Sequence, residues 1–302
     1  MNANDSFEVI PSGAALGADI VGLDLTQEIY SAVFDRVIDA WDKHLVLRFR
    51  NQDLTEDQFV RFSRYFGSLD KAPTRPVNGS YHPSREEIAV ISNIVQGGVP
   101  IGGLGNSELV WHQDMTYKEL PPKASILYGL TTPASGGDTH FYNLNRAYKT
   151  LPDALREKIK GRSCKHDATR NSAGQLRAGF DENYDNESRP GAIHPLVIKH
   201  HATGKESLYV GRRPNAWIVG LSDKESDQLL DDIWQHIKNG PHHWAQQWQP
   251  KDIVIWDNRY TLHMRGDLDP AHDRLMHRTQ IQDDAAPAAA RPNANAAVIK
   301  IH

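Results

Sequence analysis

Several features that mark common functional classes are nearly absent from this sequence. Cys164 is the only cysteine among the 302 residues, which excludes an internal disulfide framework and any metal site built from several thiolates. The formal net charge is only −4 and no basic stripe runs along the chain, so nucleic acid is not expected as a partner. No apolar run is long enough for a membrane span, so we expect no membrane role.

The N-terminus also lacks the features of a secretion signal. Residues 1–5 contain no basic side chain and are not followed by an apolar stretch. A lone cysteine is typical of a reducing compartment, and together these features predict a cytoplasmic protein. The sequence leaves open whether the chain forms a homo-oligomer.

Short strand-like segments separated by turns make up most of the chain. Four stretches instead have apolar residues at helical spacing, and two of these begin with capping boxes at Thr55 and Ser222. We expect one domain over residues 1–282, followed by a low-complexity tail over 283–302 that is rich in Ala, Pro and Asn. The pattern predicts a mainly β fold with flanking helices, arranged as a double-sheet jelly roll.

The expected elements can be given as residue ranges. Helices are predicted over 29–43, 55–66 and 145–161, and a further helix begins after Ser222. Strands are predicted over 7–10, 18–25, 45–49, 88–91, 124–130, 139–143, 193–199, 208–210 and 274–281, with 242–249 and 252–256 forming a hairpin.

The chemistry is expected to centre on an H-x-D motif. Side chains alternate along an extended segment, so His112 and Asp114 point to the same face and Gln113 points away. The strand predicted at Ile253–Trp256 is followed by a polar corner that could carry His263 to the same place. Two imidazoles and one carboxylate form the ligand set of a non-haem Fe(II) site that leaves three positions open.

Two arginines follow His263 by eleven and fifteen residues. On the predicted strand Arg274, Met276 and Arg278 share a face, so both guanidinium groups can enter one site. Arginine suits carboxylate ligands because its planar fork donates two parallel hydrogen bonds and stays charged. The pair therefore predicts anionic organic ligands beside the metal, although two surface arginines on an edge strand are the alternative.

Two long segments have little periodicity. Ser68–Gly105 is rich in Pro and Gly, and Arg170–Gly191 is polar. Irregular stretches of this length inside a compact domain are usually functional or disordered. Since the first leads directly to His112, we interpret both as mobile loops at the entrance to the site. Surface loops without a catalytic role are the alternative.

The ordered motifs resemble those of the taurine dioxygenase / phenoxyacetate-herbicide dioxygenase family. The resemblance covers the chain from about Ile10 to Ile281 and includes His263 and the two arginines. Its other motifs are Trp-His-x-Asp, Gly136-Gly137-Asp138-Thr139 and Trp256-Asp257-Asn258-Arg259.

The resemblance implies a double-stranded β-helix that binds Fe(II) and 2-oxoglutarate. By position, the iron ligands would be His112, Asp114 and His263. Related halogenases have a small residue where this chain has Asp114, which leaves them room for halide. The aspartate therefore favours hydroxylation over halogenation.

The resemblance also implies roles for three further residues. Thr139 and Arg274 would hold the distal carboxylate of 2-oxoglutarate, and Arg278 would approach the anionic group of the primary substrate. The implied reaction uses O2 to hydroxylate a small, anionic organic molecule and releases succinate and CO2.

Departures from the family pattern bear on the substrate. Ala72 stands where the taurine enzyme has a substrate-contacting histidine, and Glu108 replaces an asparagine near the co-substrate, so taurine itself is not expected. Arg212 and Arg213 lie outside the ligand set, and the sequence leaves open whether they line the site or face solvent. The pairs His200-His201 and His242-His243 are expected to be poor bidentate ligands, because adjacent side chains on an extended chain point to opposite faces.

Two other function classes remain open at this point. One is an enzyme of the same fold that carries out desaturation, epimerisation or cyclisation in a biosynthetic pathway. The other is a non-enzymatic jelly-roll protein that uses a metal structurally. A structural site usually has closed protein ligation, whereas this set has only three protein ligands and lies beside two arginines.

Overall fold

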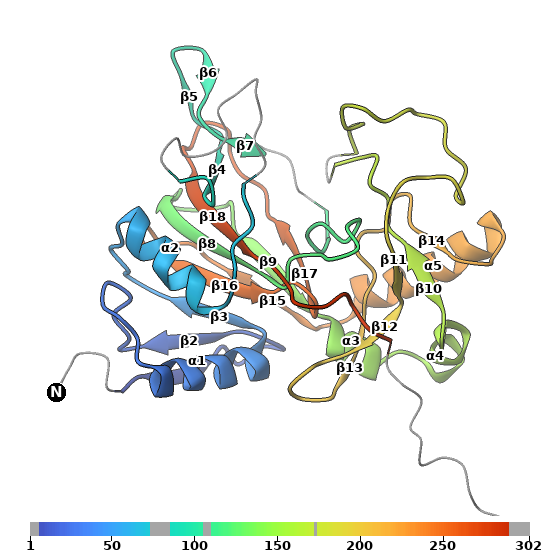
Figure 1. The fold of residues 1–302 in the computed structure, drawn as a ribbon, viewed down its shortest axis with the longest axis horizontal. Coiled ribbons are helices and arrows are strands. Elements are labelled where there is room, and N and C mark those ends of the chain that lie inside the picture. Colours follow the sequence, from blue (N-terminus) through green and yellow to red (C-terminus); the bar gives the residue numbers. More distant parts are fainter. Residues whose placement is uncertain (1–5, 73–84, 105–109, 172–173, 290–302) are drawn as a thin grey trace, which may run out of the picture.

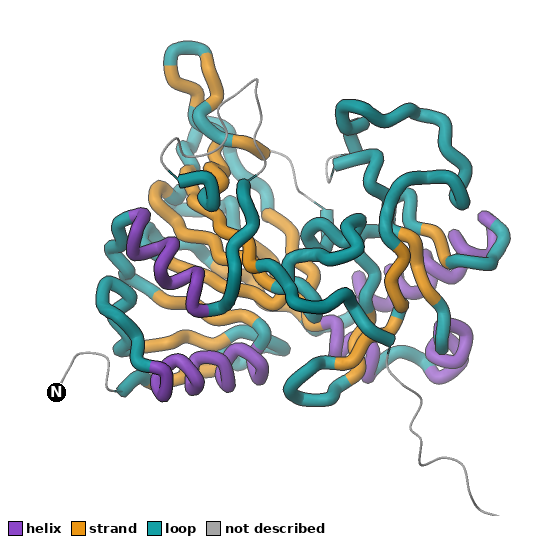
Figure 2. The backbone as a smooth tube through the Cα atoms, in the orientation of Figure 1, coloured by secondary structure: helices purple, strands orange, loops and turns teal. Residues whose placement is uncertain are grey.

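Two β-sheets face one another at the centre of the protein, and helices cover their outer faces (Figures 1 and 2). The structure, a computed structural model, describes residues 6–72, 85–104, 110–171 and 174–289. Among these residues strands outnumber helices, so the expected mainly β architecture with flanking helices is confirmed at that level.

The larger sheet has eight strands in the order β1-β2-β3-β16-β8-β18-β4-β7. Side chains of β16 alternate between its two faces. Ile253 and Ile255 pack in the core beneath the first two helices, whereas Val254 and Trp256 pack toward the second sheet. The strands span Glu8–Pro11, Ala18–Val21, Val46–Phe49, Ile253–Asp257, Ala124–Thr131, Leu275–Ile281, Ala89–Ser92 and Gly103–Leu104, in the order of the sheet.

The smaller sheet has the order β15-β9-β17, with β15 at His243–Gln246, β9 at Thr139–Asn143 and β17 at Thr261–Arg265. Phe141 of β9 packs against Trp256 of β16, with ring centroids 5.5 Å apart. The inner faces of the two sheets therefore share one buried core.

Helices α1 (Ser31–His44) and α2 (Glu56–Tyr65) cover the outer face of the larger sheet. The expected capping box at Thr55 is formed, and the aromatic face of α2 lies in the core. On the other side, α3 (Leu144–Lys149), α4 (Asp153–Ile159) and α5 (Asp223–Asn239) pack with the outer face of the smaller sheet. The capping box at Ser222 is also formed.

Short strands complete the region around α5. Strand β10 (Ser163–Lys165) pairs with β11 (Ile193–Pro195) and β14 (Trp217–Ile218), and β12 (Val197–Lys199) forms a hairpin with β13 (Glu206–Leu208). Cys164 of β10 is fully buried in the core beneath α5, and burial raises the pKa of its thiol to about 12. A separate hairpin, β5 (Val95–Gln96) and β6 (Val99–Pro100), projects from the larger sheet (Figure 1).

Four predictions of element boundaries are wrong. The strand expected over 18–25 ends at Val21. The helix expected over 145–161 is two helices, because Pro152 cannot donate a backbone hydrogen bond and disfavours helical geometry at the residue before it. The strand expected over 193–199 is β11 and β12, which join different sheets, and that expected over 208–210 ends at Leu208.

The expected hairpin over 242–256 is also wrong. Strand β15 joins the smaller sheet, whereas β16 joins the larger one. The connection is held by Asp252, whose Oδ2 accepts hydrogen bonds from the side chain of Gln246 and the backbone N–H of Gln249, at 2.8 and 3.0 Å. It therefore crosses from one sheet to the other instead of turning back within one.

The remaining expectations concern the membrane and the tail. Within the described residues no helix combines the length and the apolarity needed to span a membrane. Of the expected tail, residues 290–302 lie outside the described residues. Ala289 still forms an isolated bridge with Ile198, so the domain boundary at residue 282 stays a prediction.

Candidate active site

The three predicted metal ligands converge between the two sheets, and all three are buried. The H-x-D segment lies beside β17. The backbone N–H of His112 donates to the carbonyl of His263 at 3.0 Å, and the N–H of His263 donates back at 2.9 Å. This pairing places the two imidazoles side by side, with centroids 4.2 Å apart. Trp256 packs against the His263 ring at 4.8 Å.

The distances suit a single cation. The Nε2 atoms of His112 and His263 lie 3.6 and 3.7 Å from Oδ1 of Asp114. An ion at the usual metal–ligand distance of about 2.0–2.2 Å from each atom can lie among them. The structure thus brings three metal-ligating atoms together, and an ion held by them would leave its other coordination positions to ligands from outside the protein.

Hydrogen bonding and burial favour the protonation states that bind metal, which are neutral imidazoles and an ionised carboxylate. Nδ1 of His112 lies 2.8 Å from the carbonyl of Val110, and a proton donated there leaves Nε2 unprotonated. Burial lowers the pKa of His263 to about 3. Burial opposes ionisation of Asp114, but His263, Arg278 and His112 outweigh it and hold the pKa of the carboxyl well below its usual range.

The second oxygen of Asp114 has its own donors. Its Oδ2 accepts hydrogen bonds from Ser125 Oγ at 3.0 Å and Gln280 Nε2 at 3.3 Å, and Nη1 of Arg278 lies 3.7 Å away. Ser125 and Gln280 are direct neighbours across β8 and β18. Neither residue was predicted from the sequence, because no motif near either one marks it.

The corner after β16 holds the H-x-D segment in place. The side-chain amide of Asn258 accepts from the backbone N–H of Asp114 at 2.7 Å and donates to its carbonyl at 2.9 Å. Gln113 points away from the metal ligands, as expected, and donates to the carbonyls of Asn258 and Arg259, both at 2.9 Å. Asn258 belongs to the motif quoted above, but the sequence did not reveal this clamping role.

The predicted co-substrate residues flank one glycine turn. Thr139 opens β9, and its hydroxyl accepts a hydrogen bond from Trp248 Nε1 at 3.0 Å. Arg274 is buried just before β18. Gly137 has φ +66°, and a Cβ there would lie 3.5 Å from the Arg274 side chain, so the turn before Thr139 packs directly on this arginine.

Burial contradicts the alternative of two surface arginines. Arg274 is 4 % exposed and Arg278 is 9 % exposed. Met276 packs in the core between the sheets, and both Arg278 and Gln280 reach Asp114 from the same face of β18. The register shifts between Leu275 and Met276, so Arg274 precedes the regular part of the strand.

Arg212 and Arg213 have different surroundings, although they are adjacent in the sequence. Arg213 is paired with Asp227 and Asp231 of α5, at 2.9 and 2.6 Å. Arg212 is largely buried and donates to the backbone carbonyls of Asp167 and Arg170. Arg213 therefore forms ion pairs at the surface, and Arg212 holds the start of the irregular segment that follows Arg170.

The premise that His200 and His201 point to opposite faces is wrong. Their rings are nearly parallel, with an interplanar angle of 12° and centroids 4.9 Å apart. The alternation argument fails because 201–203 form a turn rather than an extended strand. His242 instead packs on Tyr142 at 6.0 Å and contacts Thr150. Of the two positions that depart from the family pattern, Ala72 is buried, and Glu108 lies outside the described residues.

Most of the chain is similar in sequence to known dioxygenases and related enzymes. Residues 8–280 match the family described as "Taurine catabolism dioxygenase TauD, TfdA family". Pentalenolactone F synthase of Streptomyces arenae is 29% identical over an alignment of 302 positions. The alignment covers 93% of this chain and 97% of that protein. The alpha-ketoglutarate-dependent 2,4-dichlorophenoxyacetate dioxygenase of Cupriavidus pinatubonensis is 30% identical and covers 91% and 97%.

A solved structure shares the fold. The crystal structure of AAD-2 in complex with Mn(II) and N-oxalylglycine superposes with a TM-score of 0.77 at 26% sequence identity. The alignment covers 94% of this chain and 99% of that one.

Proposed function

The chain belongs to the TauD, TfdA family of dioxygenases, and from that premise we propose that it is a 2-oxoglutarate-dependent enzyme that hydroxylates a small, anionic organic molecule at an Fe(II) site. A non-enzymatic jelly-roll protein is no longer an alternative, because the relatives at this similarity include a dioxygenase named for its alpha-ketoglutarate dependence. The products would be the hydroxylated substrate, succinate and CO2.

The observation that carries this proposal is the ligand group itself. His112, Asp114 and His263 offer two neutral nitrogen atoms and one carboxylate oxygen from one side. Iron and 2-oxoglutarate bound there would supply the activation of O2 for attack on a substrate C–H bond. The chain's own contribution is to hold the ligands in the correct protonation state and orientation.

The buried arginines set the chemistry of the organic ligands. We assign Arg274, with Thr139 beside the same turn, to the distal carboxylate of 2-oxoglutarate. Arg278 lies next to Asp114, so it is assigned to the anionic group of the primary substrate. A buried guanidinium is costly without an anion nearby, and a second anion from the substrate would add charge-assisted hydrogen bonds to it.

The arrangement of the sheets supports the finer description of the fold. The eight-stranded and three-stranded sheets enclose one core, with the ligand residues on the inner faces of β17 and β18 and on the segment paired with β17. We assign this arrangement to the double-stranded β-helix, in which a site between two sheets is built from their inward-facing side chains.

The test begins with the metal. Anaerobic Fe(II) titration of His112→Ala, Asp114→Ala and His263→Ala should show strongly reduced affinity, while far-UV circular dichroism stays close to that of the wild type. His243→Ala serves as a control, because this histidine is exposed and outside the ligand group. Undiminished iron affinity in all three variants would remove this group from the proposal.

The second part identifies the reaction. Succinate release should be measured with Fe(II), 2-oxoglutarate and a panel of small carboxylates, sulfonates, sulfates, phosphonates and amino acids. The product of the best substrate should gain the mass of one oxygen atom. A loss of two hydrogens would instead indicate desaturation, and the absence of any substrate-stimulated succinate release from anions would contradict the proposed substrate class.

A further inference from the structure

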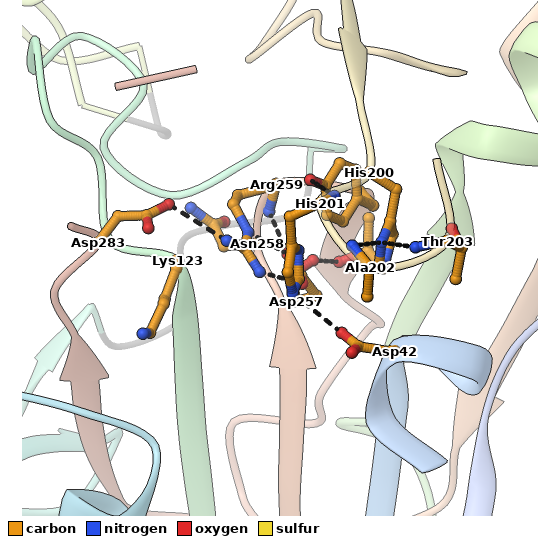
Figure 3. Close-up of polar contacts among 12 residues, drawn as sticks. Asp42, Lys123, His200, His201, Ala202, Thr203, Asp257, Asn258, Arg259 and Asp283 are labelled. Carbon is orange, nitrogen blue, oxygen red and sulfur yellow. Dashed lines mark hydrogen bonds and ion pairs between the residues drawn. The ribbon is translucent and has the colours of Figure 1, made fainter. Parts of the chain in front are cut away.

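A second group of two histidines and one aspartate lies between α1 and the β12–β13 hairpin. Asp42 belongs to the last turn of α1, and His200 and His201 begin the turn that follows β12 (Figure 3). One ligand atom from each of the three residues lies within 4.8 Å of the others. The group shares no residue with the proposed iron site.

Two buried polar atoms in this group have no hydrogen-bond partner among the described residues. They are Nε2 of His200, in a residue that is only 1 % exposed, and Oδ1 of Asp42. Buried polar atoms are nearly always satisfied by protein, water or an ion. Nε2 of His201 lies 3.3 Å from the same Asp42 oxygen, on a side chain that is 49 % exposed.

Ring packing fixes the orientation of the two imidazoles. The His200 ring stacks on Tyr260 with centroids 4.2 Å apart, and on His201 with centroids 4.9 Å apart. Tyr260 is tied to the same turn, since its hydroxyl accepts a hydrogen bond from the backbone N–H of His201 at 3.2 Å. The imidazoles are therefore held close to Asp42 with little freedom to separate.

We propose that Asp42, His200 and His201 bind a second divalent ion of the Zn(II) class and so link α1 to the β12–β13 hairpin. Two imidazole nitrogens and one carboxylate oxygen suit such a borderline ion, and water or an anion completes its coordination at the exposed side. His200 supplies the buried side of the site, and His201 covers it toward solvent.

Binding must change the tautomer of His200. Its Nδ1 accepts hydrogen bonds from the backbone N–H groups of Ala202 and Thr203, both at 3.3 Å, so the proton of the neutral ring is on Nε2. An ion at Nε2 requires this proton to move to Nδ1, which then no longer accepts. Metal binding therefore releases the two amides of the turn.

Charged residues near the proposed site determine the salt concentration at which metal binding should be measured. Asp42 and Thr203 line a cavity of about 740 Å³. Besides the carboxylate of Glu206, its wall carries five cationic side chains that repel a metal ion, namely Lys43, Arg146, Lys149, Arg156 and Lys205. Repulsion between exposed charges is screened within about 8 Å at physiological ionic strength, so titrations belong near 0.15 M salt.

Zn(II) titration by isothermal calorimetry decides whether the site exists. The wild type should bind two equivalents, one at each group. Asp42→Asn and His201→Ala should bind one, and His112→Ala should lose the other one. The control is His272→Ala, which removes an exposed histidine that lies 3.6 Å from a single aspartate, Asp269, and it should keep both. A stoichiometry in Asp42→Asn and His201→Ala equal to that of the wild type would overturn the proposal.

Hydrogen exchange tests the linked change in the turn. Zn(II) should accelerate exchange of the Ala202 and Thr203 amides in the wild type and in His112→Ala, but not in Asp42→Asn. Because His112→Ala lacks a ligand of the proposed iron site, this outcome does not depend on the proposed enzymatic function. Unchanged exchange in a protein that binds the second equivalent would refute the tautomer change.

Discussion

At the scale of single residues, the two oxygens of Asp114 have different neighbours. Oδ1 faces the imidazoles, whereas Oδ2 accepts from Ser125 and Gln280. Because Oδ2 is already hydrogen-bonded, the carboxylate would bind the proposed metal through Oδ1. Loss of a residue that orients a metal ligand typically costs about 10- to 100-fold in metal affinity or activity.

Ser125→Ala is therefore expected to weaken Fe(II) binding by about tenfold, with little change in the free energy of unfolding beyond about 1 kcal/mol. Anaerobic titration and urea unfolding measure the two effects. Ser207→Ala is the matched control, because Ser207 is also fully buried but donates to the Leu208 carbonyl. Equal iron affinity in both variants would show that Ser125 does not orient the ligand.

The two buried arginines should give different kinetic defects. Arg274→Ala is expected to raise the KM for 2-oxoglutarate, because a charge-assisted contact of about 1.5–3 kcal/mol is lost. Arg278→Ala should instead raise the KM for the primary substrate and increase succinate formation that is not coupled to product. Steady-state kinetics with each ligand varied separately, together with the succinate-to-product ratio, distinguish them. The same defect in both variants would contradict the division of roles.

His166 makes stability depend on pH. It is fully buried against Thr116, and burial, with the charges of His194 and Arg212, lowers its pKa to about 3. The unfolded chain has a histidine pKa near 6.5 and so binds a proton that the folded chain excludes. The free energy of unfolding is therefore expected to fall as the pH decreases from about 6.5, by up to about 1.4 kcal/mol per pH unit from this residue.

Urea unfolding between pH 7.5 and 4.5 tests this dependence. His166→Gln removes the titrating group and should have a shallower slope than the wild type over the same range, whatever its stability at pH 7.5. Parallel slopes for the two proteins would mean that another group is responsible.

At the scale of elements, the irregular segment 170–191 lies against the residues that follow the H-x-D motif. The guanidinium of Arg177 lies 4.0 Å from the ring centroid of Tyr117, and the backbone N–H of Ala192 donates to the Tyr117 carbonyl at 3.0 Å. Movement of this segment is thus coupled by direct contact to a position three residues after Asp114.

We predict that segments 68–105 and 170–191, of which residues 73–84, 105 and 172–173 lie outside the described residues, close over the site and become more ordered when metal, 2-oxoglutarate and substrate bind. The reason is that the reaction requires water to be excluded. Hydrogen exchange with and without the three ligands is the measurement. Exchange in α5 provides an internal reference, since most of its inward face is already buried. Equal protection of both segments in the two states, in protein shown to bind substrate, would reduce them to ordinary surface loops.

At the scale of the whole molecule, the features predicted correctly from the sequence are those formed between residues a few positions apart in the chain. The capping boxes at Thr55 and Ser222 each involve residues three apart and are formed as expected. The alternation in His112-Gln113-Asp114 likewise gave the correct orientation of three side chains. These interactions are complete within a few residues, so the surrounding fold has little opportunity to change them.

What the sequence could not predict depends on pairing between distant segments. Strands β15 and β16 are close in the chain but join different sheets. Ser125 and Gln280 act on Asp114 only because β8 and β18 bring them opposite one another. The turn after β12 reverses the expected orientation of His201, since the β12–β13 hairpin, rather than local alternation, sets its direction.

The position of the single cysteine allows opening of one core to be measured in the native sequence, without introducing a probe. Cys164 lies in the core that α5 shares with the outer face of the smaller sheet, whereas α1 and α2 pack in a different core. Since the thiolate is the reactive form, burial and the raised pKa should prevent alkylation until this core opens. The alkylation rate of the native protein would then report how often the α5 side opens, independently of fluctuations beneath α1 and α2.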